Sequence, residues 1–384
     1  MDFYKNFQNI FPNFKIKNLD LEKEAVYLNA LNLYFQKNFL KIYSFLKEYP
    51  SFSSAFSSIK KKENIKIDPL KEWHKLKKTN IEFIPFWEKC YPNLLKEISN
   101  PPLALYFLSK IFSKNNLSEI FTQYPSLAIV GTRKISEYGN KVVEKIIQEL
   151  KNFNFLIISG LAYGVDACVH KNCLKNEIFN LAILASGLTN ITPSSHFLLA
   201  KKIINKGGLI SEYPLNTPSL KQYFPWRNRI ISGLSLGVLI IEAPLKSGAL
   251  ITAHFALEQN REIFAVPGSI FNQKSSGCHL LIKNGAKLVE KAEDIIEDLI
   301  YYHPGLKEKI KNLSPQNNSF QTTLTNKEKQ VLDILSCERP VSLDKILEKI
   351  NLKTTEVLSI LSELELKGLV KENQGLYTKI YNQK

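Results

Sequence analysis

The stretch that decides the fold consists of LAIVGTRKISEYG (residues 127–139) and, after a short interval, FLIISGLAYG (residues 155–164). Each half is an apolar run that stops at glycine and small polar residues. Such runs are typical of strands buried on both faces of a parallel sheet. Two strands of this kind bring the backbone N–H groups of their loops, and Arg133, to one edge of the sheet, where open α/β sheets bind anionic ligands. The stretch therefore predicts an anion-binding edge.

Further apolar runs alternate with helical segments after this stretch, which indicates a parallel sheet with helices on both faces. The interval VVEKIIQEL (residues 142–150) has one apolar helical face. We therefore predict an α/β fold with a Rossmann-like, doubly wound, mostly parallel sheet. The predicted strands are Leu127–Val130, Phe155–Ser159, Phe179–Ala185, Gly208–Ser211, Val238–Ala243 and Ile263–Val266.

Helical and basic sequence precedes this domain. Residues 21–49 place leucines and aromatic residues at helical spacing, with lysines between them. We therefore predict a small helical accessory domain over residues 1–80. Prolines near residues 92 and 101 indicate connections into the central domain. The Rossmann-like domain, with this N-terminal connection, is placed at residues 81–300.

The C-terminal part has the pattern of a winged helix. A polar linker is predicted over residues 301–324. Thr325 and Glu328 then form a capping-box pattern, two further helical segments follow, and a Gln-Gly turn separates two β-prone arms. Three helices and a hairpin within about sixty residues predict a winged-helix domain over residues 325–384.

The charge of the chain favours polyanions. Lysine and arginine outnumber acidic residues by 51 to 36, which gives a formal net charge of +15. Nucleic acid is the first candidate partner, with anionic membranes or acidic proteins after it. The alternative is a lysine-rich composition whose charges are simply solvated. Arginine is scarce, and it is favoured over lysine where a planar bidentate contact matters, so Arg133, Arg227 and Arg229 are the leading candidates.

The remaining composition argues against several classes of protein. The 5 cysteines are scattered, which indicates reduced thiols rather than a disulfide framework. Cys168 and Cys173 flank a histidine, but no second ligand cluster completes a tetrahedral metal site. The N-terminus does not resemble a signal peptide, and no apolar run is long enough to span a bilayer. We expect a cytoplasmic protein without a membrane segment, a metal or a cofactor.

The glycine pattern excludes the usual nucleotide motifs. No G-x-G-x-x-G follows the first strand, and no Walker G-x-x-x-x-G-K-[ST] occurs in the chain. What remains is a set of glycine- and hydroxyl-containing loops at predicted strand ends, which suit phosphate oxygens. The alternative is that these are ordinary tight turns between strands and helices. The loops are 131–133, 159–164, 211–212 and 246–248.

The segment FPWRNR (residues 224–229) is the second candidate element. Two arginines beside aromatic residues combine forks for phosphates with flat surfaces for bases. In the alternative interpretation, the arginines pair with Glu212 or Glu242 and hold the domain together. We favour phosphate contact because the segment follows a loop at the predicted edge.

Six motifs in a fixed order resemble the DNA-processing protein A family (DprA/Smf): AIVGTR, SGLAYGVDACVH, SEYP, FPWRNRIISGLS, EAPLKSGALITA and AVPG. The resemblance covers nearly all of residues 91–290 and resumes at LELKGLV in the winged-helix region. It implies a cytosolic, dimeric, non-catalytic protein that binds single-stranded DNA, protects incoming strands during natural transformation and helps to load the RecA recombinase. The residues that match the family's phosphate-contacting positions are Gly131, Thr132, Arg133, Ser159, Gly160, Gly164, Arg227, Asn228, Arg229, Ser247 and Gly248.

The chain departs from the family pattern after the third predicted strand. Thr189, Thr192-Pro193 and His196 stand where an aspartate, a Tyr-Pro pair and an asparagine are usual. A basic residue that some members carry next to that proline is replaced by serine, and Lys201 or Lys202 is the nearest substitute. The N-terminal domain also lacks a Gly-x-Gly signature seen in many members.

An enzyme is the alternative function. Nucleotide hydrolases of the lysine-decarboxylase-like group share a related fold and carry P-G-G-x-G-T-x-x-E. The equivalent stretch here, residues 246–256, has no carboxylate at the required offset, so the acid/base pairing is missing. A hidden site would have to use the remaining candidates Asp166, His170, Glu212 and Glu242.

The winged helix is expected to contact protein rather than DNA. Its candidate recognition helix, residues 353–367, carries two lysines and three glutamates, which sum to a charge of −1. That sign is wrong for a helix entering a groove lined by phosphates. Any DNA contact should be weak and should come from the wing lysines, Lys371 and Lys379.

Overall fold

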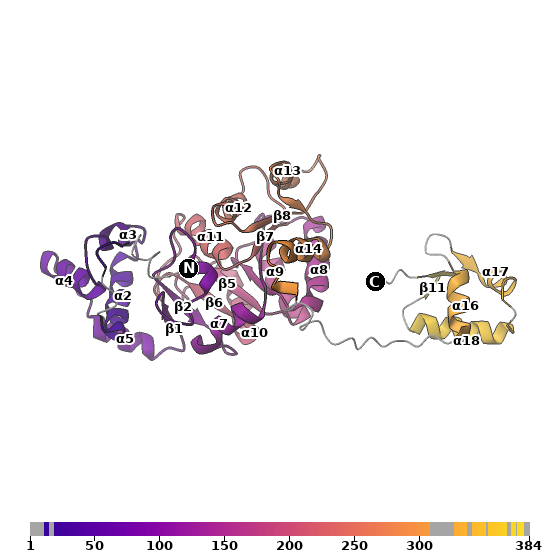
Figure 1. Ribbon diagram of the computed structural model, residues 1–384, viewed down its shortest axis with the longest axis horizontal. Coiled ribbons are helices and arrows are strands. Elements are labelled where there is room, and N and C mark those ends of the chain that lie inside the picture. The colour runs from indigo at the N-terminus through magenta and orange to yellow at the C-terminus, as the bar shows by residue number, and fades with distance from the viewer. Residues whose placement is uncertain are drawn as a thin grey trace. The chain divides into compact units, whose positions relative to one another are not determined.

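The computed structural model describes residues 11–14, 19–307, 326–335, 340–350, 352–366, 370–373 and 375–379. The chain divides into two compact units, Met1–Ser314 and Pro315–Lys384. Figure 1 shows a large first unit of helices and strands and a small second unit. Contacts join the N-terminal helices and the central sheet into one unit. The domain boundaries at residues 80 and 300 therefore remain predictions.

A nine-stranded sheet forms the centre of the first unit. Its strands are β1 (Glu82–Pro85), β2 (Ala104–Leu108), β3 (Ser126–Val130), β4 (Leu156–Ser159), β5 (Asn180–Leu184), β6 (Gly207–Ser211), β7 (Gly237–Ile240), β8 (Glu262–Ala265) and β9 (Lys287–Leu288). Their order in the sheet is β1-β2-β6-β5-β4-β3-β7-β8-β9. All neighbours from β6 to β9 in this order are parallel, whereas β2 pairs antiparallel with β1 and β6. The predicted doubly wound, mostly parallel sheet is confirmed.

Helices cover both faces of this sheet (Figure 1). They are α6 (Asn93–Lys96), α7 (Lys114–Gln123), α8 (Glu137–Leu150), α9 (Val165–Asn176), α10 (Phe197–Lys206), α11 (Tyr223–Gly233), α12 (Gly248–Glu258), α13 (Ser276–Lys283) and α14 (Ala292–Tyr302). Successive side chains of a strand point to opposite faces. Leu127 and Ile129 of β3 accordingly share a core with α8, α9 and α14, whereas Ala128 and Val130 share one with α11 and α12. These two cores sandwich the sheet, and α10 lies beside α9.

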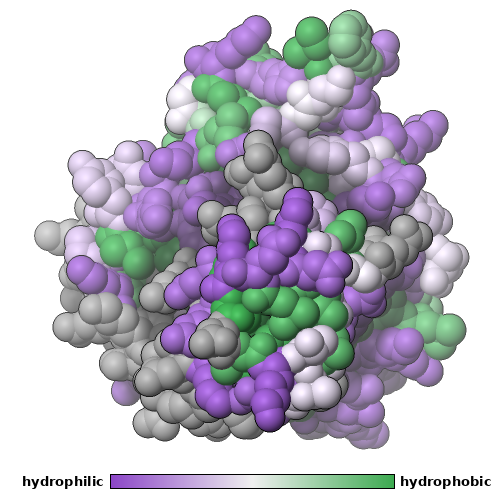
Figure 2. Space-filling model, turned by 90° about the vertical axis from the view of Figure 1, so that its right-hand side faces the viewer, coloured by the Kyte–Doolittle hydropathy of each residue, from purple (hydrophilic) through white to green (hydrophobic). Residues whose placement is uncertain are grey.

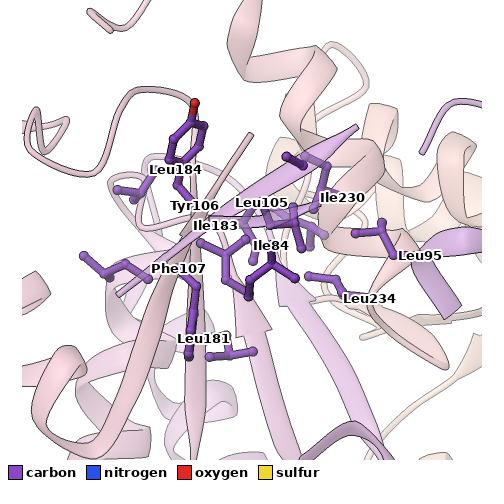
Figure 3. Close-up of a cluster of buried hydrophobic side chains, with 14 of the residues drawn as sticks. Ile84, Leu95, Leu105, Tyr106, Phe107, Leu181, Ile183, Leu184, Ile230 and Leu234 are labelled. Atoms are coloured by element: carbon purple, nitrogen blue, oxygen red, sulfur yellow. The ribbon is translucent and has the colours of Figure 1, made fainter. Parts of the chain in front are cut away.

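The strands β1 and β2 lie in the stretch that we predicted as a connection. Two prolines directly before β2 hide its strand character, and β2 extends the sheet because its backbone pairs with β6 along residues 106–108. Figure 3 shows the core at this junction, where side chains from β1, β2, β5 and α11 meet. Ile84, Leu105, Ile183 and Ile230 in this core are fully buried. The N-terminal part of the chain is therefore continuous with the central core.

Among the described residues, four helices precede the sheet: α2 (Leu21–Phe35), α3 (Lys41–Leu46), α4 (Phe52–Lys62) and α5 (Pro69–Lys77). Side-chain caps start three of them, because Asp20, Ser51 and Asp68 each accept backbone N–H groups of the first turn. The phenol of Tyr106 on β2 donates to the side-chain oxygen of Asn29 on α2 (2.8 Å). Buried polar contacts of this kind fix the helices on the sheet.

The second unit is the predicted winged helix. It contains α16 (Asn326–Ile334), β10 (Val341–Ser342), α17 (Leu343–Leu347), α18 (Thr354–Leu366), β11 (Val370–Asn373) and β12 (Leu376–Lys379). The three strands form one sheet, and a core that includes Val331, Leu361 and Val370 joins the helices to it. Asn373 pairs with Leu376, so β11 and β12 form the hairpin of the wing, and Gln374 of the predicted turn lies outside the described residues. Thr325, Lys367 and the side chains of Lys371 and Lys379 lie outside the described residues.

The surface in the view of Figure 2 is mainly hydrophilic, with hydrophobic side chains gathered in separate patches. Within the described part of the chain, no helix is both long enough and apolar enough to cross a membrane. The same residues contain no group of three or more histidine, cysteine or acidic side chains that could hold a metal ion.

Candidate nucleic-acid interface

A groove opens where the strand order of the sheet reverses. β3 and β7 are neighbours, but the chain continues from β3 to β4 on one side and from β7 to β8 on the other. Ligand crevices form at such switch points, outside the carboxyl ends of the strands. Here the loops enclose a cavity of about 520 Å³. The predicted site residues that line it are Gly131, Thr132, Arg133, Arg227, Asn228, Ser247 and Gly248.

Backbone hydrogen bonds fix the loop that follows β3. The Thr132 N–H donates to the Glu242 carbonyl (2.7 Å), and the Thr132 carbonyl accepts from the Val165 N–H (3.1 Å). A Cβ on Gly131 would lie 2.9 Å from the Glu242 carbonyl oxygen. A Cβ on Gly164, where φ is +75°, would lie 2.3 Å from the Thr132 carbonyl oxygen. Glycine is required at both positions because the backbones approach so closely, and the loop forms a rigid wall of the groove.

Three exposed cations line the groove: Arg133, Lys221 and Lys246. The Arg133 guanidinium lies 5.0 Å from the centre of the Phe224 ring, a cation–π contact that orients it. Within the described residues, none of the three cations forms an ion pair. Their charge is therefore available to an anion from solution.

Arg227 lies at the floor of the groove and is only 3% exposed. Its Nη1 donates to the Gly160 carbonyl (2.7 Å) and to the Ile183 carbonyl. Burial lowers the pKa of Arg227 to about 10, an effect that the nearby Asp166 carboxylate opposes. Burial also raises the pKa of Asp166, although Arg227 and backbone N–H groups act against that rise. Arg227 thus stays protonated at neutral pH, joins the loop after β4 to strand β5 and supplies positive charge at the floor of the groove.

The helix α12 begins at the groove. Its N-cap is Ser247, whose hydroxyl accepts from the Ala249 N–H (3.2 Å). The Asn228 side chain donates to the Gly248 carbonyl (3.3 Å) and so joins α11 to this loop. The space beside Gly248 is open, since no atom lies within 4 Å of a Cβ placed there. The positive end of the helix dipole adds to the cationic character of the groove.

The structure places Arg229 away from the groove. Its side chain is 2% exposed, and its Nη2 donates to Glu212 Oε1 at 2.5 Å. Arg229 also lies over the Trp226 ring, 4.3 Å from the ring centre. Because Arg227 and Arg229 are two residues apart on a helix, they point in nearly opposite directions. Arg229 is therefore no longer proposed as a phosphate contact. Its pairing with Glu212 is the alternative interpretation given in the sequence analysis.

Three further predicted residues shape the loop after β4 and do not line the groove. Ser159 is fully buried, and its hydroxyl donates to the Ile129 carbonyl (2.7 Å). A Cβ on Gly160 would lie 2.7 Å from the Arg227 guanidinium, and Gly164 has the close approach described above. We keep Ser159, Gly160 and Gly164 as proposed site residues, because they allow the backbone conformation of the loop beside the groove.

Lys221 and Lys246 are groove residues that sequence reasoning did not select. Lys246 precedes Ser247 directly, so its position in a predicted phosphate loop was the available signal. Lys221 lies just before α11 and carries no such signal, because lysine is the most frequent cation of the chain. Only the folded arrangement brings it to the groove.

The residues named for a hidden enzyme site all have structural partners. Glu212 pairs with Arg229, and both oxygens of Glu242 accept from Ser136, one from its N–H (2.8 Å) and one from its hydroxyl (2.6 Å). Both glutamates are 1% exposed. A general acid or base must reach a substrate proton, and these carboxylates are enclosed by protein.

His170 is fully buried on α9 and shares a 2.9 Å hydrogen bond between its Nδ1 and the Asn180 side-chain oxygen. Burial lowers the pKa of His170 to about 4, although the Asn180 contact acts in the opposite direction. The unfolded chain binds this proton near pH 6.5, so the folded state loses stability as pH falls from about 6.5 to about 4. Because glutamine does not titrate, we expect the free energy of unfolding of His170→Gln to fall by about 3 kcal/mol less than that of the parent over this pH range. Urea unfolding of parent and variant at several pH values measures the difference, and parallel pH curves would contradict the expectation.

The fold and groove define a doubly wound α/β protein with a cationic groove at its switch point and an attached winged helix. A family model described as "DNA recombination-mediator protein A" matches residues 82–300, and a "DprA winged helix domain" model matches residues 316–375. The chain belongs to the DNA recombination-mediator protein A (DprA/Smf) family.

Individual relatives agree with this assignment. The chain is 36% identical to protein Smf of Escherichia coli K12 over 308 residues, which cover 79% of each chain. It is similar to the X-ray structure of DNA processing protein A from Streptococcus pneumoniae, with a TM-score of 0.58, 33% identity, and coverage of 71% of this chain and 92% of that one. It is also similar to the Helicobacter pylori DNA processing protein A, whose structure is described by its single-stranded DNA binding mode; the TM-score is 0.50, the identity 25%, and the coverage 58% and 96%.

Proposed function

We propose that this protein binds single-stranded DNA in the groove at the switch point and acts by binding rather than by catalysis. One observation carries the proposal: the exposed cations Arg133, Lys221 and Lys246, which form no ion pair within the described residues, converge on an open groove whose walls are backbone loops. Cations and backbone N–H groups bind phosphates without reading base sequence. Phe224 and Pro225 add flat apolar surface beside the cations, which suits bases that are not paired.

The shape of the groove favours a strand over a single nucleotide. The cavity is partly open to solvent, and the chain lacks the glycine motifs of a nucleotide pocket. A flexible strand can lay successive phosphates along Arg133, Lys221 and Lys246. A rigid duplex offers its bases only in its own grooves, so stacking on Phe224 requires a single strand.

The wider role follows from the family. We propose that the protein protects incoming single strands in the cytoplasm and helps to load the RecA recombinase onto them during natural transformation, acting as a homodimer. The support is the family's description as a recombination mediator and the single-stranded DNA binding described for the Helicobacter pylori relative. The winged helix, with its acidic α18, is proposed to contact protein.

The direct test is fluorescence anisotropy with labelled single-stranded and double-stranded oligonucleotides of equal length. We expect preferential binding of the single strand, with an affinity that falls as salt rises. A chain ending at Ser314, without the second unit, is expected to keep most of this affinity. Equal affinity for the duplex, or loss of single-strand binding in the shortened chain, would contradict the proposal. Turnover of nucleoside monophosphates by the purified protein would instead support the enzyme alternative.

A further inference from the structure

A second groove lies between α9 and α10, on the helical layer next to the switch-point groove. Its cavity is about 700 Å³. α9 and α10 pack side by side, and the groove follows the line between them. It is lined on one side by Lys171, Leu174 and Lys175 and on the other by Leu198, Leu199, Lys202, Asn205 and Lys206, with Ser195 and His196 at one end.

The charge of this α9–α10 groove has one sign. Its four lysines stand one helical turn apart in two pairs, 171 and 175 on α9 and 202 and 206 on α10. No carboxylate is among the residues that line it. Lys175 and Lys206 pair with Glu144 and Glu177 outside the groove, each at 2.8 Å. Lys171 and Lys202 are exposed and form no ion pair within the described residues.

The two grooves meet at the loop after β4. Ala162 lines the switch-point groove, and the next residue, Tyr163, reaches the end of the α9–α10 groove. The Tyr163 ring lies 5.0 Å from the His196 ring, and its hydroxyl accepts from Ser195 Oγ (3.3 Å). Tyr163 is 51% exposed. A single aromatic side chain therefore bridges the two cationic grooves at the carboxyl edge of the sheet.

We propose that a bound single strand continues from the switch-point groove across Tyr163 into the α9–α10 groove, where Lys171 and Lys202 contact its phosphates. This inference rests on the proposed binding of single-stranded DNA and extends it to a second contact region. Two observations favour a DNA strand over an acidic peptide: neighbouring residues of the loop after β4 contact the two grooves, and an exposed aromatic ring stands between them, where a base can stack. Exposed Leu198, 70% accessible, adds apolar surface for bases along the same path.

The length of the oligonucleotide separates the two contact regions. An oligothymidine of about 6 nucleotides fills the first groove alone, whereas one of about 20 nucleotides also reaches the second. We expect the double variant Lys171→Gln/Lys202→Gln to bind the short oligonucleotide like the parent. Its affinity for the long one should fall about tenfold, and the slope of log affinity against log salt should become shallower by about 1.4, since each phosphate contact contributes about 0.7.

Lys141→Gln/Lys145→Gln on α8 is the matched control, because it removes the same charge from a helix whose lysines already face Glu137 and Glu149. It should leave both oligonucleotides unaffected. If the α9–α10 variant binds the long oligonucleotide like the parent, or weakens the short one equally, the second contact region does not exist. If the parent binds neither oligonucleotide, the proposed function itself fails, which is a separate outcome.

Chemical protection gives an independent readout on the unaltered protein. Lysine acylation followed by mass spectrometry measures the accessibility of each amine. Lys171 and Lys202 should be protected by the long oligonucleotide and not by the short one, whereas Lys246 should be protected by both. Equal acylation of Lys171 and Lys202 with and without the long oligonucleotide would overturn the proposal.

Discussion

Replacing Glu212 by alanine is expected to lower the free energy of unfolding of the first unit by about 3–5 kcal/mol, because it leaves the buried charge of Arg229 without its carboxylate partner. Glu212 Oε1 accepts both from Arg229 and from the Tyr43 hydroxyl (2.6 Å). Burial raises the pKa of Tyr43 well above its ordinary value, and Glu212 adds to that rise. Glu212→Ala therefore removes the hydrogen bond from Tyr43 on α3 as well as the ion pair with Arg229. Urea unfolding followed by circular dichroism measures it.

A charge-free replacement of the pair separates this role from DNA binding. Glu212→Leu/Arg229→Met removes both charges and fills the space with apolar atoms, so it should recover most of the lost stability. It should also bind single strands like the parent, because Arg229 does not reach the groove. A folded double variant that has lost its affinity for DNA would show instead that Arg229 contacts phosphate.

The second large effect is expected at the groove. Arg133→Ala/Lys246→Ala removes two exposed cations of the groove, and each charge-assisted phosphate contact is worth roughly a factor of ten. We therefore expect an affinity for single strands about 100-fold below that of the parent, with a salt slope shallower by about 1.4. Anisotropy titrations at several salt concentrations measure both quantities.

Stability provides the control for this variant. Arg133 and Lys246 are exposed and form no ion pair in the described part of the chain, so their removal, which loses only the cation–π contact of Arg133 with Phe224, should change the unfolding midpoint little. The affinity of Arg133→Lys for single strands should lie between those of the parent and the alanine variant, because lysine keeps the charge but not the planar fork. Parent-like affinity of the double alanine variant across the salt range would exclude this groove as the DNA site.

The central strands could be predicted because their chemistry is local. β3 to β7 are buried on both faces, so each appears as a short apolar run between polar loops, and β8 is buried at Phe264 and Ala265. β2 could not be predicted in this way, because prolines precede it and its partner β6 lies about a hundred residues further along the chain. β9 has only two residues, both exposed, and carries no apolar signal at all.

The site could be predicted in outline and not in its details. Sequence order located the loops at the switch point, because parallel strands place their carboxyl ends together. It could not separate Arg227 from Arg229, since that requires knowing that both lie on one helix and point in opposite directions. It also could not find Lys221, which only folding brings beside Arg133.

The pairing of β2 with β6 has a consequence for how the chain folds during synthesis. β2 is made early, but its partner residues Leu209–Ser211 leave the ribosome only after about a hundred further residues. Until then the β2 edge and the aromatic side chains of the N-terminal helices lack the core residues that β5 and β6 contribute. Closing so long a loop is also entropically slow. The first unit should therefore acquire its native structure in one late step, and nascent chains that stop before β6 should be sensitive to protease along residues 82–108.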